Sequence, residues 1–191
     1  MADTAQRRWT LEDYLAWEAT QVARHEFVDG FVRAMAGGTT AHNLIAGNVF
    51  LELRVRLRGK GCMPYAQNTR VMIPAGNVRY PDVVVDCAPV RANDTAAIAP
   101  TVIVEVLSRS TTAVDLTDKL DEYQSIESIR HILHLYQDKV RGALWTKGSD
   151  GWRRTPLEGV DAVVQLDAID VGFPLALAYI DVPFGEEAGE A

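Results

Sequence analysis

The 191-residue chain has only two cysteines, Cys62 and Cys87, and neither belongs to a C-x-x-C pair or has a histidine nearby in the sequence. This excludes a zinc knuckle and a redox-active motif, and it predicts two small core residues in a reducing compartment. The chain also lacks the run of roughly 18 apolar residues that a membrane helix needs, and it has no apolar N-terminal segment of the secretory type. We therefore expect a cytoplasmic protein that does not enter a membrane.

Several motifs of nucleotide-binding and hydrolytic proteins are missing as well. There is no GxxxxGK[ST] phosphate loop, no GxGxxG, no GxSxG and no HExxH. These absences remove most of the support for nucleotide-driven motors, dinucleotide enzymes, serine hydrolases and zinc proteases. Basic residues are also scarce, 19 against 26 acidic ones, and the resulting net charge of −7 speaks against nonspecific attraction to nucleic acid.

The composition that remains is typical of a folded domain. Apolar residues make up 48% of the chain and charged residues 24%, which is enough to bury a core and too apolar for a disordered protein. We expect one domain over residues 1–182 and a disordered acidic tail over 183–191.

The hydrophobic pattern alternates between helical and strand-like periods. It predicts a helix over 11–19 capped by Thr10, a hairpin over 24–35 turning at Asp29-Gly30, a helix from Thr39 or Thr40 to Gly59, and a helix from Thr111 or Thr112 to about 126. The predicted strands cover 63–66, 69–74, 78–87, 101–107, 131–136, 142–146 and 152–155. The β-branched run at 101–107 marks the centre of the sheet.

Two acidic residues stand where a strand should be apolar. Glu105 shares one face of the predicted strand TVIVEVL with Ile103 and Leu107, and an ionised carboxylate buried there costs several kcal/mol unless a cation or a proton compensates. Asp82 follows Pro81, which suggests a strand start or a bulge that aims the carboxylate outward from the sheet end.

Carboxylates on neighbouring strands can converge on one site, and such hard oxygen ligands suit Mg²⁺ or Mn²⁺. The alternative is structural, with Asp82 capping a turn and Glu105 pairing with an interior arginine or lysine. Asp86 shares the Asp82 face but is expected to be solvated at a strand end.

Lys119 borders the inward arc of the helix DLTDKLDEY, about 60° from its centre at roughly 100° per residue. One interpretation is a surface salt bridge with Asp115, four residues earlier. The other is an ammonium beside a metal-bound phosphate, where it could orient a water molecule or offset charge in the transition state.

Five blocks taken in order resemble a known family. RHEFVDGFVRAMAG, TAHNLIAGNV, YPDVVVDC, PTVIVEVLSRST and D-x-x-x-K-x-x-x-Y are similar to the Uma-two family, an uncharacterised branch of restriction-endonuclease-like proteins in the PD-(D/E)xK nuclease superfamily. The resemblance implies an α/β fold with a central mixed sheet flanked by helices, and metal-dependent hydrolysis of phosphodiester bonds.

The resemblance also implies a ligand set. Asp82 and Glu105 would hold Mg²⁺ or Mn²⁺ together with the backbone carbonyl of Val106, and Glu26 matches the acid that the superfamily supplies from its first helical block. The superfamily lysine two residues after the second acid is replaced here by Leu107.

Lys119 matches the lysine of this branch and would act from the neighbouring helix, with Asp115 and Tyr123 as supporting residues of the same block. That substitution requires the Lys119 side chain to reach inward.

Further candidates for nucleic-acid contacts precede Asp82. His42 follows Gly-Gly-Thr-Thr at a helix start, where it could touch a phosphate or simply pack and cap the helix. The stretch 53–80 contains six cations and no acid, and part of it is explained by a solvated helix end. These cations are Arg54, Arg56, Arg58, Lys60, Arg70 and Arg79.

The remaining histidines, His25, His131 and His134, have no metal-ligand spacing and are expected to be structural, and the four tryptophans are expected in the core or an interface. The leading hypothesis is a Mg²⁺-dependent endonuclease acting on DNA, for which double-strand cutting favours a homodimer or higher homo-oligomer. One alternative is a nuclease-fold protein that binds nucleic acid or assembles without catalysis. Another is carboxylate-pair chemistry on a sugar.

Overall fold

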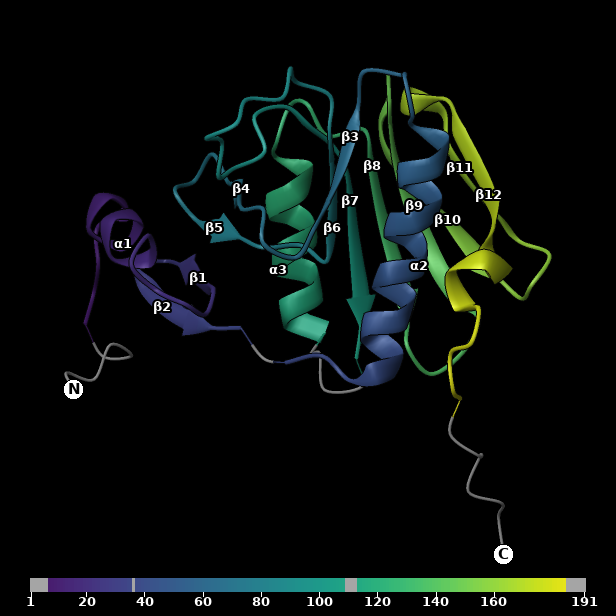
Figure 1. The fold of residues 1–191 in the computed structure, drawn as a ribbon, viewed down its shortest axis with the longest axis horizontal. Helices are drawn as coiled ribbons and strands as arrows, with labels where there is room; N and C mark the ends of the chain where they lie inside the picture. The colour runs from purple at the N-terminus through teal and green to yellow at the C-terminus, as the bar shows by residue number, and fades with distance from the viewer. Residues whose placement is uncertain (1–6, 36, 109–112, 185–191) are drawn as a thin grey trace, which may run out of the picture.

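The computed structural model describes residues 7–35, 37–108 and 113–184, the side chains of 113–115 excepted, and its elements alternate between sheets and helices (Figure 1). The N-terminal half contains α1 (Leu11–Glu18), β1 (His25–Val28), β2 (Phe31–Ala34), α2 (Thr40–Arg56), β3 (Met63–Ala66), β4 (Val71–Met72), β5 (Val78–Arg79) and β6 (Val83–Asp86). The C-terminal half contains β7 (Pro100–Leu107), α3 (Ala113–Gln124), β8 (His131–Tyr136), β9 (Arg141–Gly148), β10 (Gly151–Glu158), β11 (Val163–Leu166), the 3₁₀ helix η1 (Asp167–Ile169), β12 (Val171–Pro174) and the 3₁₀ helix η2 (Leu175–Tyr179).

The main layer is a six-stranded sheet in the order β10-β9-β8-β7-β6-β3. β7 and β8 run parallel, and the connection between them contains α3, as parallel neighbours require. The other neighbouring pairs of this sheet are antiparallel. The α/β fold with a central mixed sheet is therefore confirmed, with the 101–107 segment inside it.

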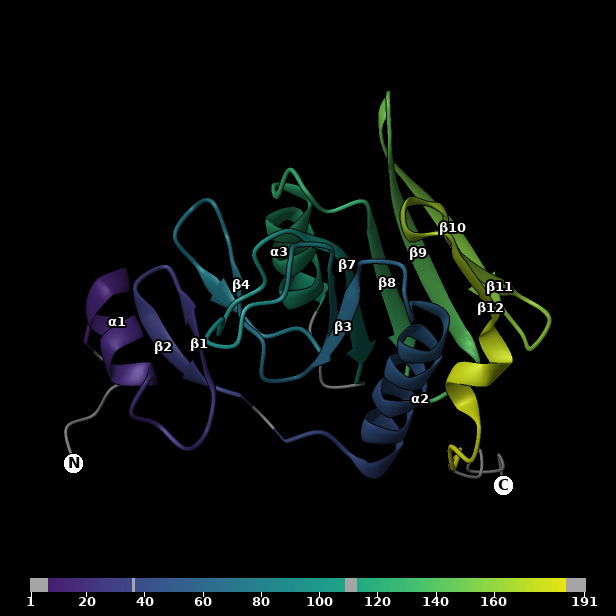
Figure 2. The ribbon, with the colours of Figure 1, turned by 45° about the horizontal axis from the view of Figure 1, so that its top comes forward.

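The two faces of this sheet are covered by different helices, which Figure 2 shows on opposite sides of the strands. α2 packs Val49 and Leu53 against a face that includes Val104. α3 packs Tyr123 against the face that includes Ile103. The predicted alternation along β7 is thus observed, and Glu105 belongs to the α3 side.

A smaller sheet, in the order β2-β1-β5-β4, lies with α1 at the left of Figure 1. Its hairpin turns at Asp29 and Gly30, whose φ angles of 52° and 87° are those of the two-residue turn that the Asp-Gly pair predicts. Tyr14 of α1 packs against Phe27 of β1, and together they form part of a separate small core.

The predicted strand over 78–87 is wrong in one respect, because the structure divides it between the two sheets. β5 pairs with β1 and β4 in the small sheet, whereas β6 pairs with β3 and β7 in the large one. The break falls at Tyr80–Asp82 and includes Pro81, which has no N–H to donate to a ladder. Asp82 therefore lies at the junction of the two sheets.

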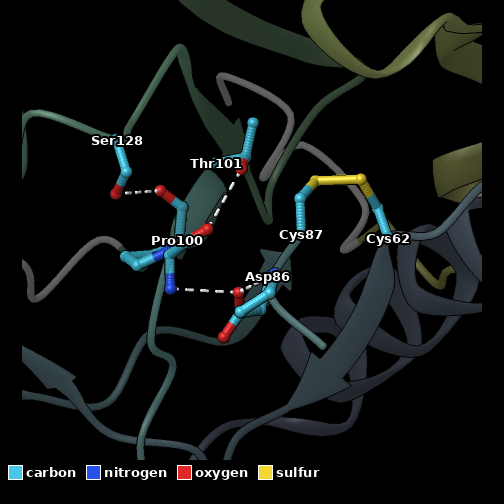
Figure 3. Close-up of a disulfide and its surroundings, with 8 residues drawn as sticks. Cys62, Asp86, Cys87, Pro100, Thr101 and Ser128 are labelled. Carbon is cyan, nitrogen blue, oxygen red and sulfur yellow. Dashed lines mark hydrogen bonds between the residues drawn. A yellow bond between two sulfur atoms is a disulfide. The ribbon is translucent and has the colours of Figure 1, made fainter. Parts of the chain in front are cut away.

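The prediction of two separate cysteines is also wrong, since Cys62 and Cys87 form a disulfide with Cα atoms 4.0 Å apart (Figure 3). Met63 pairs with Asp86 at the end of the β3/β6 ladder, so the cysteines stand one residue beyond that pair on facing strands. The two are 25 residues apart in the chain, and only the register of the strands brings them together.

Asp86 is buried at 5% exposure rather than solvated. Its carboxylate accepts backbone N–H groups from Ala88 at 2.8 Å, Ile98 at 2.6 Å and Ala99 at 3.1 Å, and its place beside the disulfide is visible in Figure 3. The residue holds the start and end of the loop between β6 and β7, so its role is structural.

Some segments fall outside the sequence predictions or outside the described residues. β11, β12 and η2 add Val164, Phe173 and Leu175 to the α2 side of the core, and none of these three elements was predicted. The predicted helix start at Thr111 or Thr112, the Asp115 side chain and most of the predicted acidic tail lie outside the described residues. No helix among those described is long and apolar enough to cross a membrane.

Candidate active site

Asp82 lies where the chain passes from the small sheet to the large one, with 12% of its side chain exposed. Its Oδ2 accepts the backbone N–H of Val106 at 2.8 Å, which ties it to the neighbouring strand β7. The same oxygen lies 3.2 Å from Nε2 of His42 on the first turn of α2. Asp82 is therefore held between the sheet and a helix.

Glu105 projects from β7 toward α3 with 12% of its side chain exposed. Its Oε1 accepts a hydrogen bond from the Tyr123 hydroxyl at 2.7 Å and lies 3.6 Å from Nζ of Lys119. Burial raises the pKa of the Glu105 carboxyl to about 7, with the nearby Asp82 carboxylate adding to that shift and Lys119 opposing it. The two acids that the sequence singled out are thus close enough to interact.

The Lys119 side chain reaches inward from α3, as a lysine that compensates for Leu107 must. Its Nζ lies 3.0 Å from Oε1 of Glu26 in addition to its contact with Glu105. Burial disfavours the charged ammonium, but the carboxylates of Glu105 and Glu26 outweigh that effect and raise its pKa. The raised pKa keeps Lys119 protonated at neutral pH, between the carboxylates of Glu26 and Glu105.

Glu26 comes from strand β1 of the hairpin, not from a helix. Its Oε2 accepts a hydrogen bond from Arg79 at 2.9 Å, so both of its oxygens face cations. Burial would raise the pKa of Glu26, but Lys119 and then Arg79 more than offset it, and the pKa is lowered. In this arrangement Glu26 holds Lys119 rather than grouping with Asp82 and Glu105.

Arg79 pairs with Glu122 as well as with Glu26, so the ion pairs extend from Lys119 to Glu122. The sequence predicted neither of these two roles. Arg79 is 4% exposed, and its Nε donates to Oε2 of Glu122 at 2.6 Å. Asn77 donates to the other Glu122 oxygen at 2.5 Å. Glu122 lies three residues after Lys119, so the two share one helix face, and that spacing was the available signal.

The remaining predicted basic residues do not gather at the acids. Arg54 is 12 residues after His42 on α2, a separation of about 18 Å along a helix that rises about 1.5 Å per residue. Arg56 donates to the carbonyl of Gly172 and Lys60 to Asp170, both near β12. Arg54 contacts Met63, Arg58 is exposed, and Arg70 bonds Thr95.

The His42 side chain contacts Asp82 in this structure. Its backbone N–H donates to Oγ1 of Thr39, the N-cap of α2, while its ring faces the carboxylate. The hydrogen bond with Asp82 raises the pKa of the His42 imidazole, although burial works against it. The ring therefore positions a candidate metal ligand, which is a different task from touching a phosphate at the helix start.

The other histidines have structural surroundings, as expected. His25 lies 3.1 Å from Oε2 of the buried Glu18. His131 lies between the Thr146 hydroxyl at 3.2 Å and the backbone N–H of Ala168, also at 3.2 Å. The tryptophans pack against the cores. Trp9, just before α1, and Trp17, on α1, pack on the small core, and Trp145 and Trp152 pack on the α3 side of the large sheet.

The donor set fits a divalent metal held by two carboxylates. Within the described part of the chain, the contacts of these carboxylates are made by Oδ2 of Asp82 and Oε1 of Glu105, which leaves the second oxygen of each carboxylate available. Burial raises the pKa of Glu105, and a cation bound beside the carboxylate would stabilise its charged form. Mg²⁺ commonly binds through one or two carboxylates and several waters.

A larger side-chain cage is not formed by the described residues. Within 7–35, 37–108 and 113–184, no three histidine, cysteine, aspartate or glutamate side chains are grouped so that they could hold a metal. The ion pairs of Glu26 account for this, because they turn its carboxylate toward Arg79 and Lys119. A site built on Asp82 and Glu105 would depend on backbone and water oxygens for its remaining ligands.

The fold and sequence both match known proteins. A crystal structure described as that of a "putative nuclease belonging to DUF820" from Anabaena variabilis superposes with a TM-score of 0.73 at 14% identity, covering 90% of this chain and 97% of that one. The uncharacterised protein slr1290 of Synechocystis sp. is 31% identical over 176 residues, which are 91% of this chain and 92% of that protein. Protein sll1609 of the same organism is 26% identical over 167 residues, 85% and 94% of the two chains. The model of the Uma2 family, described as "Putative restriction endonuclease", matches residues 11–178.

Proposed function

The chain belongs to the Uma2 family of restriction-endonuclease-like proteins, and from this premise we propose that it is a Mg²⁺-dependent endonuclease that hydrolyses phosphodiester bonds of DNA. One observation carries the proposal. Asp82 accepts the backbone N–H of Val106, the residue that follows Glu105, and the Lys119 ammonium lies 3.6 Å from Glu105. Two carboxylates can hold Mg²⁺, and a lysine beside them can offset the charge that develops on a phosphate.

Each carboxylate is oriented before any ligand binds. The Val106 N–H and the His42 ring fix one oxygen of Asp82, and the Tyr123 hydroxyl fixes one oxygen of Glu105. Asp82, Glu105 and the Val106 carbonyl would hold the ion. When bound, Mg²⁺ activates a water molecule and neutralises charge on the phosphate.

Lys119 supplies the charge that Leu107 cannot. An ammonium has three N–H donors. Among the described residues it contacts the carboxylates of Glu26 and Glu105, and its third donor would reach a phosphate oxygen or the attacking water. Because Glu26 is itself fixed by Arg79, the ammonium is held beside Glu105 from a neighbouring helix. Its task is to orient the water and to offset negative charge that develops in the transition state.

The proposal is tested with purified protein, supercoiled plasmid and either Mg²⁺ or Mn²⁺. We expect cleavage that EDTA stops and that Asp82→Asn or Glu105→Gln reduces to background. Lys119→Met should lower the cleavage rate by roughly 100-fold, the scale on which a single transition-state donor acts. Mn²⁺ binding measured by calorimetry provides a second readout, and it should be lost in both carboxylate variants but retained in Lys119→Met.

Asp121→Asn is the matched control, since Asp121 is an exposed acid on α3 two residues after Lys119. It should cleave and bind Mn²⁺ like the unchanged protein. Cleavage that survives Asp82→Asn or Glu105→Gln in repurified protein would show that the site is elsewhere. Cutting both strands of a duplex requires two such sites, so the proposal includes a homodimer, which light scattering measures.

A second candidate function is a nuclease-fold protein that binds nucleic acid or assembles without catalysis. Leu107 favours it, because it occupies the position of the superfamily lysine, and so does the pairing of Lys119 with two acids. Calorimetry that detects no Mn²⁺ binding at millimolar concentration, together with DNA binding that does not depend on the metal, would favour this candidate.

A further inference from the structure

A pocket of about 240 Å³ lies directly beside Asp82, between α2 and the residues that follow β3. Asn43, Gly47 and Phe50 line it from the helix, and Gln67 lines it from the opposite side. The pocket is smaller than the roughly 300–1,000 Å³ of sites for drug-sized ligands. It therefore has room for one small group of a substrate bound at Asp82.

The lining favours a flat, neutral group. Asp82 is the one charged residue in the described lining, so a phosphate would be repelled there. Phe50 offers an apolar ring, and nucleobases pack on such rings whatever their sequence. The amides of Asn43 and Gln67 can each donate and accept hydrogen bonds, which is how side chains recognise the edge of a base.

Gln67 has an unusual backbone that places it at this site. Its φ angle is +32°, in the left-handed region that disfavours residues other than glycine and asparagine. The conformation is held by a hydrogen bond from the Gln67 N–H to the carbonyl of Asp82 at 3.0 Å. Residues kept in such conformations cluster at functional sites, and this one is joined directly to a candidate metal ligand.

We propose that this pocket binds one unstacked base of the nucleic-acid substrate next to the scissile phosphate. Phe50 packs against the base, while Asn43 and Gln67 contact its edge and set the base preference of cleavage. The assignment rests on the proposed nuclease function, because it takes the substrate to be a nucleic acid that is cut at Asp82 and Glu105.

Gly47 allows the pocket to be filled without damage to the fold. A Cβ added at Gly47 would meet no heavy atom within 4 Å, so a larger side chain has space. Alanine and leucine are also better helix formers than glycine. Gly47→Leu therefore blocks the pocket while α2 stays intact, and Val55→Leu, at a half-exposed position two turns further along α2, is the matched control.

The first experiment measures binding without catalysis. The four deoxynucleosides are titrated into the protein without metal, with deoxyribose and inorganic phosphate as separate controls, and the backbone amide signals of Gly47 and Gln67 are followed by NMR. We expect saturable shifts with at least one nucleoside, none with phosphate, and binding at least tenfold weaker in Gly47→Leu but unchanged in Val55→Leu. Equal binding to Gly47→Leu, or no nucleoside shifts at these residues, would overturn the assignment.

The second experiment measures base preference on DNA with randomised sequence around the cut. Gln67→Gly removes the amide and relieves the left-handed backbone, whereas Gln67→Asn keeps an amide on a residue that tolerates this conformation. We expect Gln67→Gly to lose base preference while folding normally, and Gln67→Asn to retain part of it.

The two experiments separate the two proposals. Cleavage with a preference unchanged in Gly47→Leu and Gln67→Gly would overturn the base pocket and leave the nuclease function standing. Nucleoside binding that Gly47→Leu abolishes, in a protein that cuts no DNA, would support the pocket and reject the nuclease function.

Discussion

His134 is a single buried side chain whose charge state depends on its position in the sheet. It lies on β8 opposite Glu105 on β7 and is 7% exposed. Burial, together with the nearby cations Arg154 and Lys119, lowers the pKa of its imidazole to about 4. The ring is therefore neutral in the folded protein at pH values where the unfolded chain would protonate it.

This difference predicts a pH-dependent stability. Because the folded pKa lies below the unfolded value of about 6.5, the unfolded state binds more protons, so the contribution of His134 is fully present above about pH 6.5 and is lost as the pH falls toward about 4. Between about pH 7.5 and about pH 5 the loss should be about 2 kcal/mol. Urea unfolding at both pH values, in the unchanged protein and in His134→Gln, measures it.

The difference between the two proteins isolates the effect of His134, because the carboxylates and His131 are present in both. We expect the stability of His134→Gln to fall less between the two pH values than that of the unchanged protein. Equal falls would mean that His134 is protonated in the folded state.

At the scale of elements, the disulfide joins the chain just before β3 to the residue after β6 at the edge of the large sheet. β3 is an edge strand that pairs only with β6 in the sheet order, and β6 leads directly from Asp82. The residue after β3, Gln67, bonds Asp82. The cross-link therefore strengthens the pair of strands on which one candidate ligand and one wall of the pocket depend.

We expect reduction of the disulfide to destabilise the protein by about 3 kcal/mol, the scale for closing a loop of this length. The measurement is urea unfolding with and without a phosphine reductant. The double variant Cys62→Ala with Cys87→Ala should be insensitive to the reductant. Labelling of two free thiols in unreduced, denatured protein would show instead that the cysteines are unpaired, as the sequence had suggested.

At the scale of the whole molecule, the ion pairs around Arg79 connect the small sheet to the large one. Arg79 lies on β5, and its partners are Glu26 on β1 and Glu122 on α3, which packs on the large sheet. The hairpin turn is tied to the same place, since Asn77 accepts the backbone N–H of Asp29 and donates to Glu122. The Lys119 position thus depends on how the two sheets dock.

Arg79→Met should therefore lower the stability of the folded protein, and any effect on substrate binding should follow from that loss. Removing one partner from a buried ion pair typically costs roughly 3–5 kcal/mol because the remaining charges lose their compensation. Urea unfolding of Arg79→Met checks this value, with Arg58→Met, at an exposed arginine, expected to change stability by less than about 0.5 kcal/mol. A stable Arg79→Met protein with weakened DNA binding would instead support the role in phosphate contact that the sequence suggested.

Local physical chemistry determined much of the fold in advance. Alternation along 101–107 identified a buried strand and assigned Glu105 to one face, and the Asp29-Gly30 pair determined a two-residue hairpin. Helical spacing placed Lys119 beside the core. These inferences worked because periodicity, turn conformation and the cost of burying a charge depend on a few neighbouring residues.

The tertiary structure decided what depends on distant segments. Strand register paired Cys62 with Cys87 and buried Asp86, and the passage between two sheets divided the strand at Pro81. Arg79 was predicted to contact phosphate, but the docking of the two sheets buries it as the partner of Glu26 and Glu122. The sequence by itself singled out Asp82 and Glu105, because a carboxylate stands out in an apolar strand, whereas Lys119 was indicated by its helical spacing and by the family resemblance. Which cations surround them, and the pocket beside Asp82, were set only when segments far apart in the chain packed together.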